Sequence, residues 1–293
     1  MVNDRRADGD NGKENNPLAK ETAQMTFEKG LTPRQLFFLS AAYMLSGAFI
    51  FRTRGVFTLA VSFLLWTVIS GTTVILKNRK PDILSGGVFS AVLAATCAFT
   101  AALDIFALYG FSSVHESGVS TLVFIFSAVA VCVFFSTEIK LLGRLSELAP
   151  YLFAIATLTS LPYLRISLSA FDDGYIFPCF FPAVPIILCS EACDAASSPS
   201  PALAANKNIG KPFFCSLFGA LSGTLLYIPF SASNFSENGI LLVFIWSTAF
   251  LRLSCDFFSV ARLCREKHGF LPAAAFSAFV FFAFFCISKT PPV

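Results

Sequence analysis

The stretch LTPRQLFFLSAAYMLSGAFIF, residues 31–51, is the first apolar segment of the chain, and the interpretation of the remainder depends on it. Its apolar part, residues 36–51, is about long enough to cross a bilayer, which takes roughly 20 residues, if the membrane thins or the ends snorkel. Ser46-Gly47 lies near the middle, where a continuous helix would prefer Leu or Ala. No small-residue cleavage site follows, so we expect the segment to be retained. It therefore predicts a membrane helix with a weak point near its centre.

The composition excludes a soluble globular protein. Of the 293 residues, 55% are hydrophobic and only 13% are charged, 36 are Phe, and the mean hydropathy is +0.70. A soluble domain of this size needs more polar surface than these residues supply. The net charge of +3 is too small to indicate a nucleic-acid partner. We therefore predict a polytopic membrane protein whose main surroundings are the lipid bilayer.

Nine apolar segments follow a polar tail at residues 1–30, which we expect to be disordered and cytoplasmic. Runs this long without period-two alternation favour helices over barrel strands, because backbone groups in lipid must bond within their own segment. The prediction is an all-α membrane bundle, with residues 31–293 as one transmembrane domain. The predicted segments are 35–51, 55–76, 86–110, 118–137, 149–166, 176–190, 213–231, 239–262 and 270–288.

The basic residues fall mostly on one side if these segments alternate across the membrane. That side collects 16 Lys and Arg, and the other side collects four. Cytoplasmic loops carry the excess of basic residues in membrane proteins. The split therefore places the N-terminus in the cytoplasm of a multi-pass protein and the C-terminus outside.

The sixth segment is abnormal. Its short apolar run contains Pro178, Pro182 and Pro185 and then gives way to polar chain. Non-helical backbone at membrane depth is tolerated only where it is buried in protein or lines a wet cavity. The first and sixth segments occupy corresponding positions if the chain is built as two repeats of five, and paired interrupted helices indicate a central substrate site in secondary transporters. We therefore predict a LeuT-like inverted repeat with broken first and sixth helices.

Four short elements carry a resemblance to a known family. They are Thr32-Pro33-Arg34-Gln35-Leu36-Phe37-Phe38-Leu39, Arg144-Leu-Ser-Glu147-Leu-Ala-Pro150, Ser190-Glu191 and Ile245-Trp246. In these elements the chain resembles the B subunits of spore germinant receptors, the GerAB-type endospore germination permeases of the amino acid/polyamine/organocation (APC) superfamily. It is similar to a divergent member that stops short of the usual tenth helix.

The resemblance implies a small amino acid-like nutrient bound between the first, third, sixth and eighth segments. It also implies A-type and C-type receptor subunits as partners in a bacterial inner membrane, of the cell or the spore. Unwound backbone in the first segment would offer amides to a carboxylate, because a helix N-terminus carries partial positive charge. The expected ligand-binding residues are Ser46, Gly47, Ala48, Thr96, Thr100, Ser190, Glu191, Ser247 and Thr248.

Alternative roles stay open for these polar residues. Ser and Thr side chains in membrane helices more often bond to their own helix or to a neighbouring one than to a ligand. Glu191 either binds a substrate ammonium or a proton, or caps amides of the unwound backbone. The GxxxG sequence at residues 219–223 predicts close helix packing, with no ligand role.

Charged residues inside the segments form a further set of candidates. Arg252 and Asp256 are four residues apart and can form a structural ion pair on one helix face. A ligand site is the alternative for this pair. Asp104 lies near the outer end of the third segment, where water is expected to solvate it; a functional role is again the alternative.

No sequence motif indicates an enzyme or a cofactor. The chain contains no GxSxG, HExxH, P-loop or CxxC sequence. The leading hypothesis is a ligand-sensing receptor subunit. The alternatives are a secondary amino acid transporter coupled to protons or sodium, and a structural subunit that binds no ligand.

Overall fold

The computed structural model describes residues 31–51, 56–79, 87–113, 139–163, 210–231 and 239–265. These residues form six α-helices, one short 3-10 helix and no strand, which confirms the predicted all-α class. The elements are α2 (Pro33–Ile50), α3 (Val56–Arg79), α4 (Gly87–Ser113), α6 (Ile139–Ser160), η2 (Leu161–Tyr163), α9 (Gly210–Ser231) and α10 (Gly239–Arg265). The tail 1–30 and the predicted segments 118–137, 176–190 and 270–288 lie outside the described residues. The nine-helix count and the inverted repeat therefore stay predictions.

Five of the six described helices are long and apolar enough to cross a membrane, namely α3, α4, α6, α9 and α10. The chain is thus a multi-pass membrane protein by the length and composition of its helices. The exception, α2, has 18 residues and carries the polar Arg34 and Gln35 in its first turn. It is instead the most enclosed helix, because every residue from Leu39 to Ile50 is buried.

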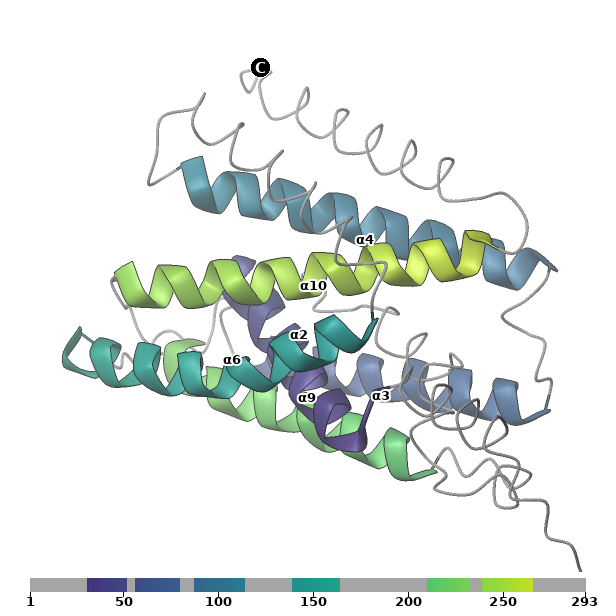
Figure 1. Cartoon of the computed structure of the whole chain (residues 1–293), viewed down its shortest axis with the longest axis horizontal. Helices are drawn as coiled ribbons and strands as arrows, with labels where there is room; N and C mark the ends of the chain where they lie inside the picture. The colour runs from purple at the N-terminus through teal and green to yellow at the C-terminus, as the bar shows by residue number, and fades with distance from the viewer. Residues whose placement is uncertain are drawn as a thin grey trace, which may run out of the picture.

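Helix α2 lies at the centre of the described bundle. It contacts α9, α10, α6 and α4, and in Figure 1 it runs obliquely across the directions of α10, α6 and α9. Helices α4 and α10 also pack against each other. A helix that is apolar all round is stable only when protein or lipid covers every face. Here neighbouring helices cover α2, so the small and polar residues in its middle do not face lipid.

The closest contact of α2 is with α9, and it depends on glycine. A Cβ atom at Gly219 would overlap the carbonyl oxygen of Phe37, and one at Gly223 would lie 2.5 Å from the carbonyl oxygen of Ala41. The hydroxyls of Ser40 and Ser216 meet at 2.7 Å in the same interface. Small residues let helix backbones approach in this way. The prediction that the GxxxG sequence serves close packing is confirmed.

The predicted break in the first helix is wrong. Helix α2 runs without interruption through Ser46 and Gly47, and the backbone N–H of Phe51 donates to the carbonyl oxygen of Gly47 at 3.1 Å. Gly47 therefore does not end the helix, because its carbonyl oxygen is satisfied within the last turn. Burial among four helices offsets the low helix propensity of Ser and Gly.

The predicted start of the fifth segment at residue 149 is also wrong. Helix α6 begins ten residues earlier, at Ile139, so the Arg144–Pro150 element lies inside a helix. Pro150 is an interior residue of this helix. Prolines are tolerated in membrane helices because neighbouring groups satisfy the backbone groups that they free.

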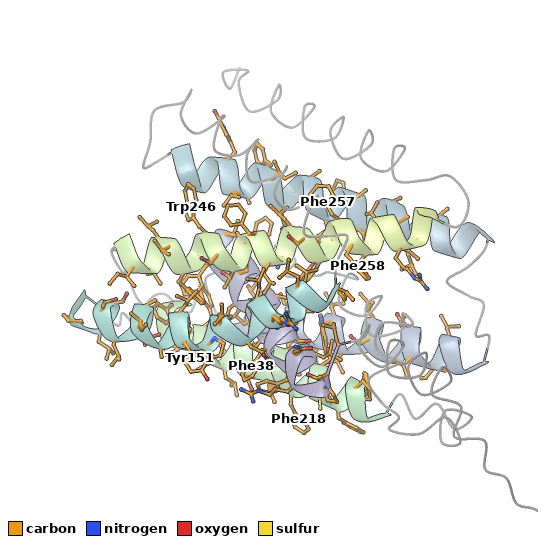
Figure 2. The ribbon with its side chains drawn as sticks, viewed as in Figure 1. Phe38, Tyr151, Phe218, Trp246, Phe257 and Phe258 are labelled. Atoms are coloured by element: carbon orange, nitrogen blue, oxygen red, sulfur yellow. The ribbon has the colours of Figure 1, made fainter. Side chains whose placement is uncertain are left out.

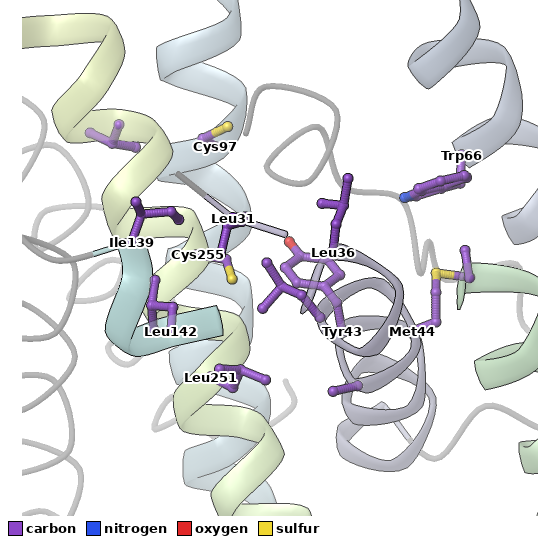
Figure 3. Close-up of a cluster of buried hydrophobic side chains, with 14 of the residues drawn as sticks. Leu31, Leu36, Tyr43, Met44, Trp66, Cys97, Ile139, Leu142, Leu251 and Cys255 are labelled. Carbon is purple, nitrogen blue, oxygen red and sulfur yellow. The ribbon is translucent and has the colours of Figure 1, made fainter. Parts of the chain in front are cut away.

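Two hydrophobic clusters fill the space around α2. One surrounds its first half and includes Leu36, Tyr43, Leu142 and Leu251 (Figure 3). The other surrounds its second half, where Phe49 makes edge-on contacts with the rings of aromatic residues from α9 and α10, namely Tyr227, Phe230 and Phe244. Edge-to-face pairs of this kind add stability beyond the area that they bury.

The outer faces of the helices are apolar as well. Tyr151 on α6 and Phe218 on α9 are exposed and point away from the bundle (Figure 2). Other large apolar side chains behave alike on each spanning helix, for example Leu64, Val92, Leu158, Leu225 and Val243. Contiguous exposed apolar surface is unusual for a soluble protein and normal for one surrounded by lipid.

Candidate functional site

A charged pair lies in the interior of the bundle, where α4 and α10 face each other. The Nε of Arg252 donates to Asp104 Oδ2 at 2.6 Å, and both side chains are 0% exposed. The two residues are 148 positions apart in the sequence. Removing one member of a buried ion pair costs about 3–5 kcal/mol, because the other charge is left uncompensated. This contact therefore fixes α4 against α10.

Helix α2 completes the site with Tyr43 and Gly47. The hydroxyl of Tyr43 donates to Asp256 Oδ1 at 2.6 Å, and its side chain extends from α2 toward α10 (Figure 3). The Tyr43 carbonyl oxygen accepts a hydrogen bond from Arg252 Nη1 at 3.1 Å. The guanidinium also lies 4.6 Å from the centroid of the Tyr43 ring. A cation over an aromatic face is attracted by the ring quadrupole.

Gly47 makes room for the guanidinium. A Cβ atom at this position would overlap Arg252 Nη1. Gly47, which was predicted to lie in a helix break, thus has another role. Because it lacks a side chain, an arginine from α10 can reach the backbone of α2. We call Tyr43, Gly47, Asp104, Arg252 and Asp256 the buried charged cluster.

Three oxygen atoms at this junction accept or donate no hydrogen bond among the described residues. They are Ser46 Oγ, Asp104 Oδ1 and Asp256 Oδ2. All three residues are 0% exposed. Buried polar groups are nearly always hydrogen-bonded, so each exception calls for an explanation such as a bound ion, water or ligand.

The structure changes the interpretation of the charged residues. The prediction for Asp104 as a residue solvated at a helix end is wrong, because this side chain is fully buried within α4 and binds Arg252. Arg252 interacts electrostatically with Asp256 as well, but its ion pair at 2.6 Å is with Asp104. A direct Arg252–Asp256 ion pair stays a prediction.

Three of the four segments predicted to hold the ligand do meet. The first, third and eighth segments correspond to α2, α4 and α10, which pack against one another. Thr100 and Asp104 are one turn apart on α4, as are Thr248 and Arg252 on α10, and all four are buried. Ala48, on α2, is buried in the second hydrophobic cluster. Ser190 and Glu191 lie outside the described residues.

The predicted hydroxyls of α4 and α10 bond to their own helices. Each donates to a carbonyl oxygen three or four residues earlier: Thr96 to Val92, Thr100 to Thr96, Ser247 to Val243, and Thr248 to Phe244 and Ile245. This is the commoner arrangement for Ser and Thr in membrane helices. Ligand binding by these four residues stays a prediction. Among the described hydroxyls that were predicted to bind the ligand, that of Ser46 bonds to no described residue.

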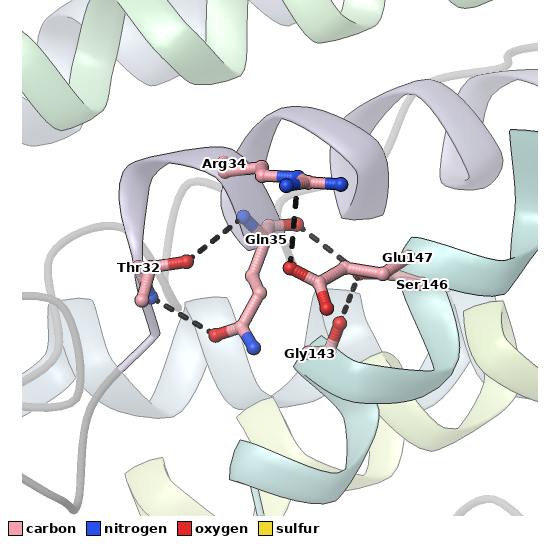
Figure 4. A network of polar contacts seen from close by, with 6 residues as sticks. All are labelled: Thr32, Arg34, Gln35, Gly143, Ser146 and Glu147. Atoms are coloured by element: carbon pink, nitrogen blue, oxygen red, sulfur yellow. Dashed lines mark hydrogen bonds and ion pairs between the residues drawn. The ribbon is translucent and has the colours of Figure 1, made fainter.

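A second polar region joins the start of α2 to α6, and we call it the N-terminal junction (Figure 4). Thr32 Oγ1 accepts from the backbone N–H of Gln35 at 3.2 Å, and the Gln35 side chain accepts from the backbone N–H of Thr32 at 3.0 Å. The Ser146 hydroxyl lies 3.2 Å from the Gln35 carbonyl oxygen and 2.7 Å from that of Gly143. Arg34 and Glu147 form a partly exposed ion pair at 3.9 Å.

Sequence reasoning missed both the capping box and the partner of Arg252. The first had a signal: a Thr followed three residues later by Gln, with Pro at the first helical position, is a helix start. The second had none, because the Asp104–Arg252 contact joins distant segments. Only the packing of α4 against α10 brings them together.

Chemically, the buried charged cluster can exchange a proton or hold a small charged group, since it combines one guanidinium, two carboxylates and a phenol. The described residues contain no group of three or more His, Cys, Asp or Glu that could hold a metal ion. The described cysteines Cys97, Cys215 and Cys255 are not joined in disulfide bonds. Comparison of the chain with protein-family models, curated proteins and solved structures found no match.

Proposed function

We propose that this chain is a nutrient-sensing membrane subunit, similar to the B subunits of spore germinant receptors, that binds a small amino acid-like ligand at the centre of its bundle. The observation that carries the proposal is the buried charged cluster where α2, α4 and α10 meet. Ionisable groups at membrane depth are expensive and usually mark ligand, ion or proton sites. A guanidinium and two carboxylates also match the opposite charges of an amino acid.

The receptor context comes from the resemblance. Two of its elements, residues 32–39 and 144–150, contact each other through Gln35 and Ser146 at the N-terminal junction. This contact supports a common structural role for two elements that are distant in sequence. The proposed partners are A-type and C-type receptor subunits in a bacterial inner membrane, with the N-terminus in the cytoplasm.

Ligand binding is tested on the purified chain with a panel of amino acids. Under the proposal, at least one amino acid raises the melting temperature, and Gly47→Leu abolishes this rise by displacing Arg252. Gly71→Leu is the matched control, because a Cβ atom at Gly71 would meet no atom within 4 Å. No stabilisation by any amino acid, together with normal germination of spores carrying Gly47→Leu, would contradict the proposal.

The receptor role has its own tests. Spores that lack this chain should lose the response to one nutrient, and A-type and C-type subunits should co-purify with it. A reporter fused ahead of Met1 should be cytoplasmic. Normal germination of the deletion strain on every nutrient would exclude a sensing role.

A proton-coupled amino acid transporter is the second candidate. The buried carboxyl groups of Asp104 and Asp256 favour it, because chains of carboxyl groups carry protons in pumps and transporters. Uptake of labelled amino acid by vesicles that contain this chain alone, driven by a pH gradient, would favour transport over sensing.

A further inference from the structure

The charges of the buried cluster do not balance. Arg252 supplies one positive charge, whereas Asp104 and Asp256 supply two negative charges when both are ionised. All three side chains are 0% exposed, so water does not screen the excess. An uncompensated charge in such a place is strongly unfavourable, and carboxyl groups there bind a proton instead.

The hydrogen bonds show where the imbalance lies. Asp104 Oδ2 receives the Nε–H of Arg252, and Asp256 Oδ1 receives the hydroxyl of Tyr43. The remaining oxygens, Asp104 Oδ1 and Asp256 Oδ2, have no donor among the described residues. When both are ionised, the two carboxyl groups also repel each other within the same buried cluster. One proton bound by this pair would remove that repulsion and make the cluster neutral.

We propose that Asp104 and Asp256 share one bound proton, with Arg252 as the resident counter-ion and Tyr43 as the fixed donor that orients Asp256. The site joins α2, α4 and α10, so loss of the proton would leave a negative charge at the junction of three helices. Proton binding in this place would couple the protonation of one carboxyl group to the packing of the bundle.

Among the described residues, the other ionisable groups near α2 do not supply the missing charge. On α6, Arg144 is exposed, and the half-buried Glu147 pairs with Arg34 at the N-terminal junction. The phenol of Tyr227 on α9 belongs to the second hydrophobic cluster. Cys97 on α4 and Cys255 on α10 are buried in the first hydrophobic cluster, and a neutral thiol adds no charge.

A proton fits the site better than a metal cation. Calcium ions take about six to eight oxygen ligands. The described oxygens without a hydrogen-bond partner at this junction are Ser46 Oγ, Asp104 Oδ1 and Asp256 Oδ2. Groups of three or more metal-binding side chains are also absent from the described part of the chain. A neutral carboxyl group carries no charge and needs only one acceptor for its proton.

Infrared spectroscopy of the purified, ligand-free protein tests the proposal. At neutral pH the wild-type protein should show a carboxylic-acid C=O band that shifts in D₂O. Asp256→Asn and Asp104→Asn should each abolish this band, because one carboxylate and one guanidinium then balance. The matched control Glu147→Gln, which changes a partly exposed carboxyl group, should retain it.

Three outcomes would overturn the proton site. The first is the absence of the band from wild-type protein, which needs no variant and so does not depend on how the variants fold. The second is a band that persists in both Asn variants. The third is a melting temperature that rises with sodium but not with choline chloride in protein without the band, which indicates a cation site. The measurements contain no amino acid, so failure of the nutrient-binding proposal would leave them interpretable.

Discussion

The buried charged cluster and the N-terminal junction both attach α2 to its neighbours, and they differ most in exposure. In the buried charged cluster, Arg252 and Asp104 are 0% exposed, whereas at the N-terminal junction the side chains of Arg34 and Glu147 are 68% and 34% exposed. Both regions contain an ion pair. Water screens the second pair and does not reach the first. Breaking the buried pair should therefore cost far more stability than breaking the exposed pair. Four substitutions test this difference.

Removing the guanidinium should have the largest effect. Arg252→Met leaves Asp104 and Asp256 buried without a resident cation, and we expect a loss of about 3–5 kcal/mol in stability or failure to accumulate in the membrane. Thermal unfolding in detergent measures the change. Arg34→Met is the matched control, and similar melting temperatures for the two variants would contradict the comparison.

An uncharged contact of the same helix provides a reference for scale. In Gly219→Ala the new methyl group would overlap the carbonyl oxygen of Phe37, which cannot move without displacing α2. Overpacking of this kind typically costs about 1–3 kcal/mol. Gly71→Ala on α3 meets open space and should be neutral or stabilising. An equal melting temperature for both variants would show that the α2–α9 contact is looser than described.

Loss of the helix cap should have a smaller effect. Thr32→Ala removes the acceptor for the Gln35 backbone N–H, and the typical cost of losing such a cap is about 1 kcal/mol. Hydrogen exchange at the first turn of α2 should accelerate, while exchange near Gly47 stays unchanged. Faster exchange along the whole helix would mean that the N-terminal junction controls α2 more strongly than its exposure indicates.

The weakest effect is expected for the partly exposed ion pair. Glu147→Gln should change stability by less than about 1 kcal/mol, because the pair is long at 3.9 Å and Arg34 is mostly in water. The expected shift of the melting temperature is small and disappears in high salt. A loss as large as that of Arg252→Met would refute the view that burial decides the weight of the two pairs.

Much of the fold follows from the sequence. The apolar segments predicted at 55–76, 86–110, 213–231 and 239–262 correspond to α3, α4, α9 and α10. Long apolar runs are dependable signals, because a helix satisfies its own backbone in lipid. The start of α6 was not predictable, because the charged residues at 140–147 are typical of a loop. The continuity of α2 was not predictable either, because the small pair Ser46-Gly47 is typical of a helix break when the neighbouring helices are unknown.

The candidate site was predictable only in part. Patterns in the sequence indicated that the segments corresponding to α2, α4 and α10 contribute to a site. They also indicated Gly47, Arg252 and Asp256 as candidate residues. It assigned Gly47 to a helix break and Asp104 to a solvated helix end, because local patterns carry no information about which distant segment approaches. Both assignments were wrong because of one arginine from α10. Arg252 fills the space beside Gly47 and pairs with Asp104.

The stretch 31–51 shows which properties follow from the sequence and which follow from the tertiary structure. By itself the sequence determined that this stretch is an apolar segment in a chain of membrane helices, because composition and run length are local properties. Only the tertiary structure decided that α2 is central and unbroken, and that Gly47 faces the Arg252 side chain. A charge at membrane depth is stable only with partners, and those partners come from segments that sequence order does not bring together.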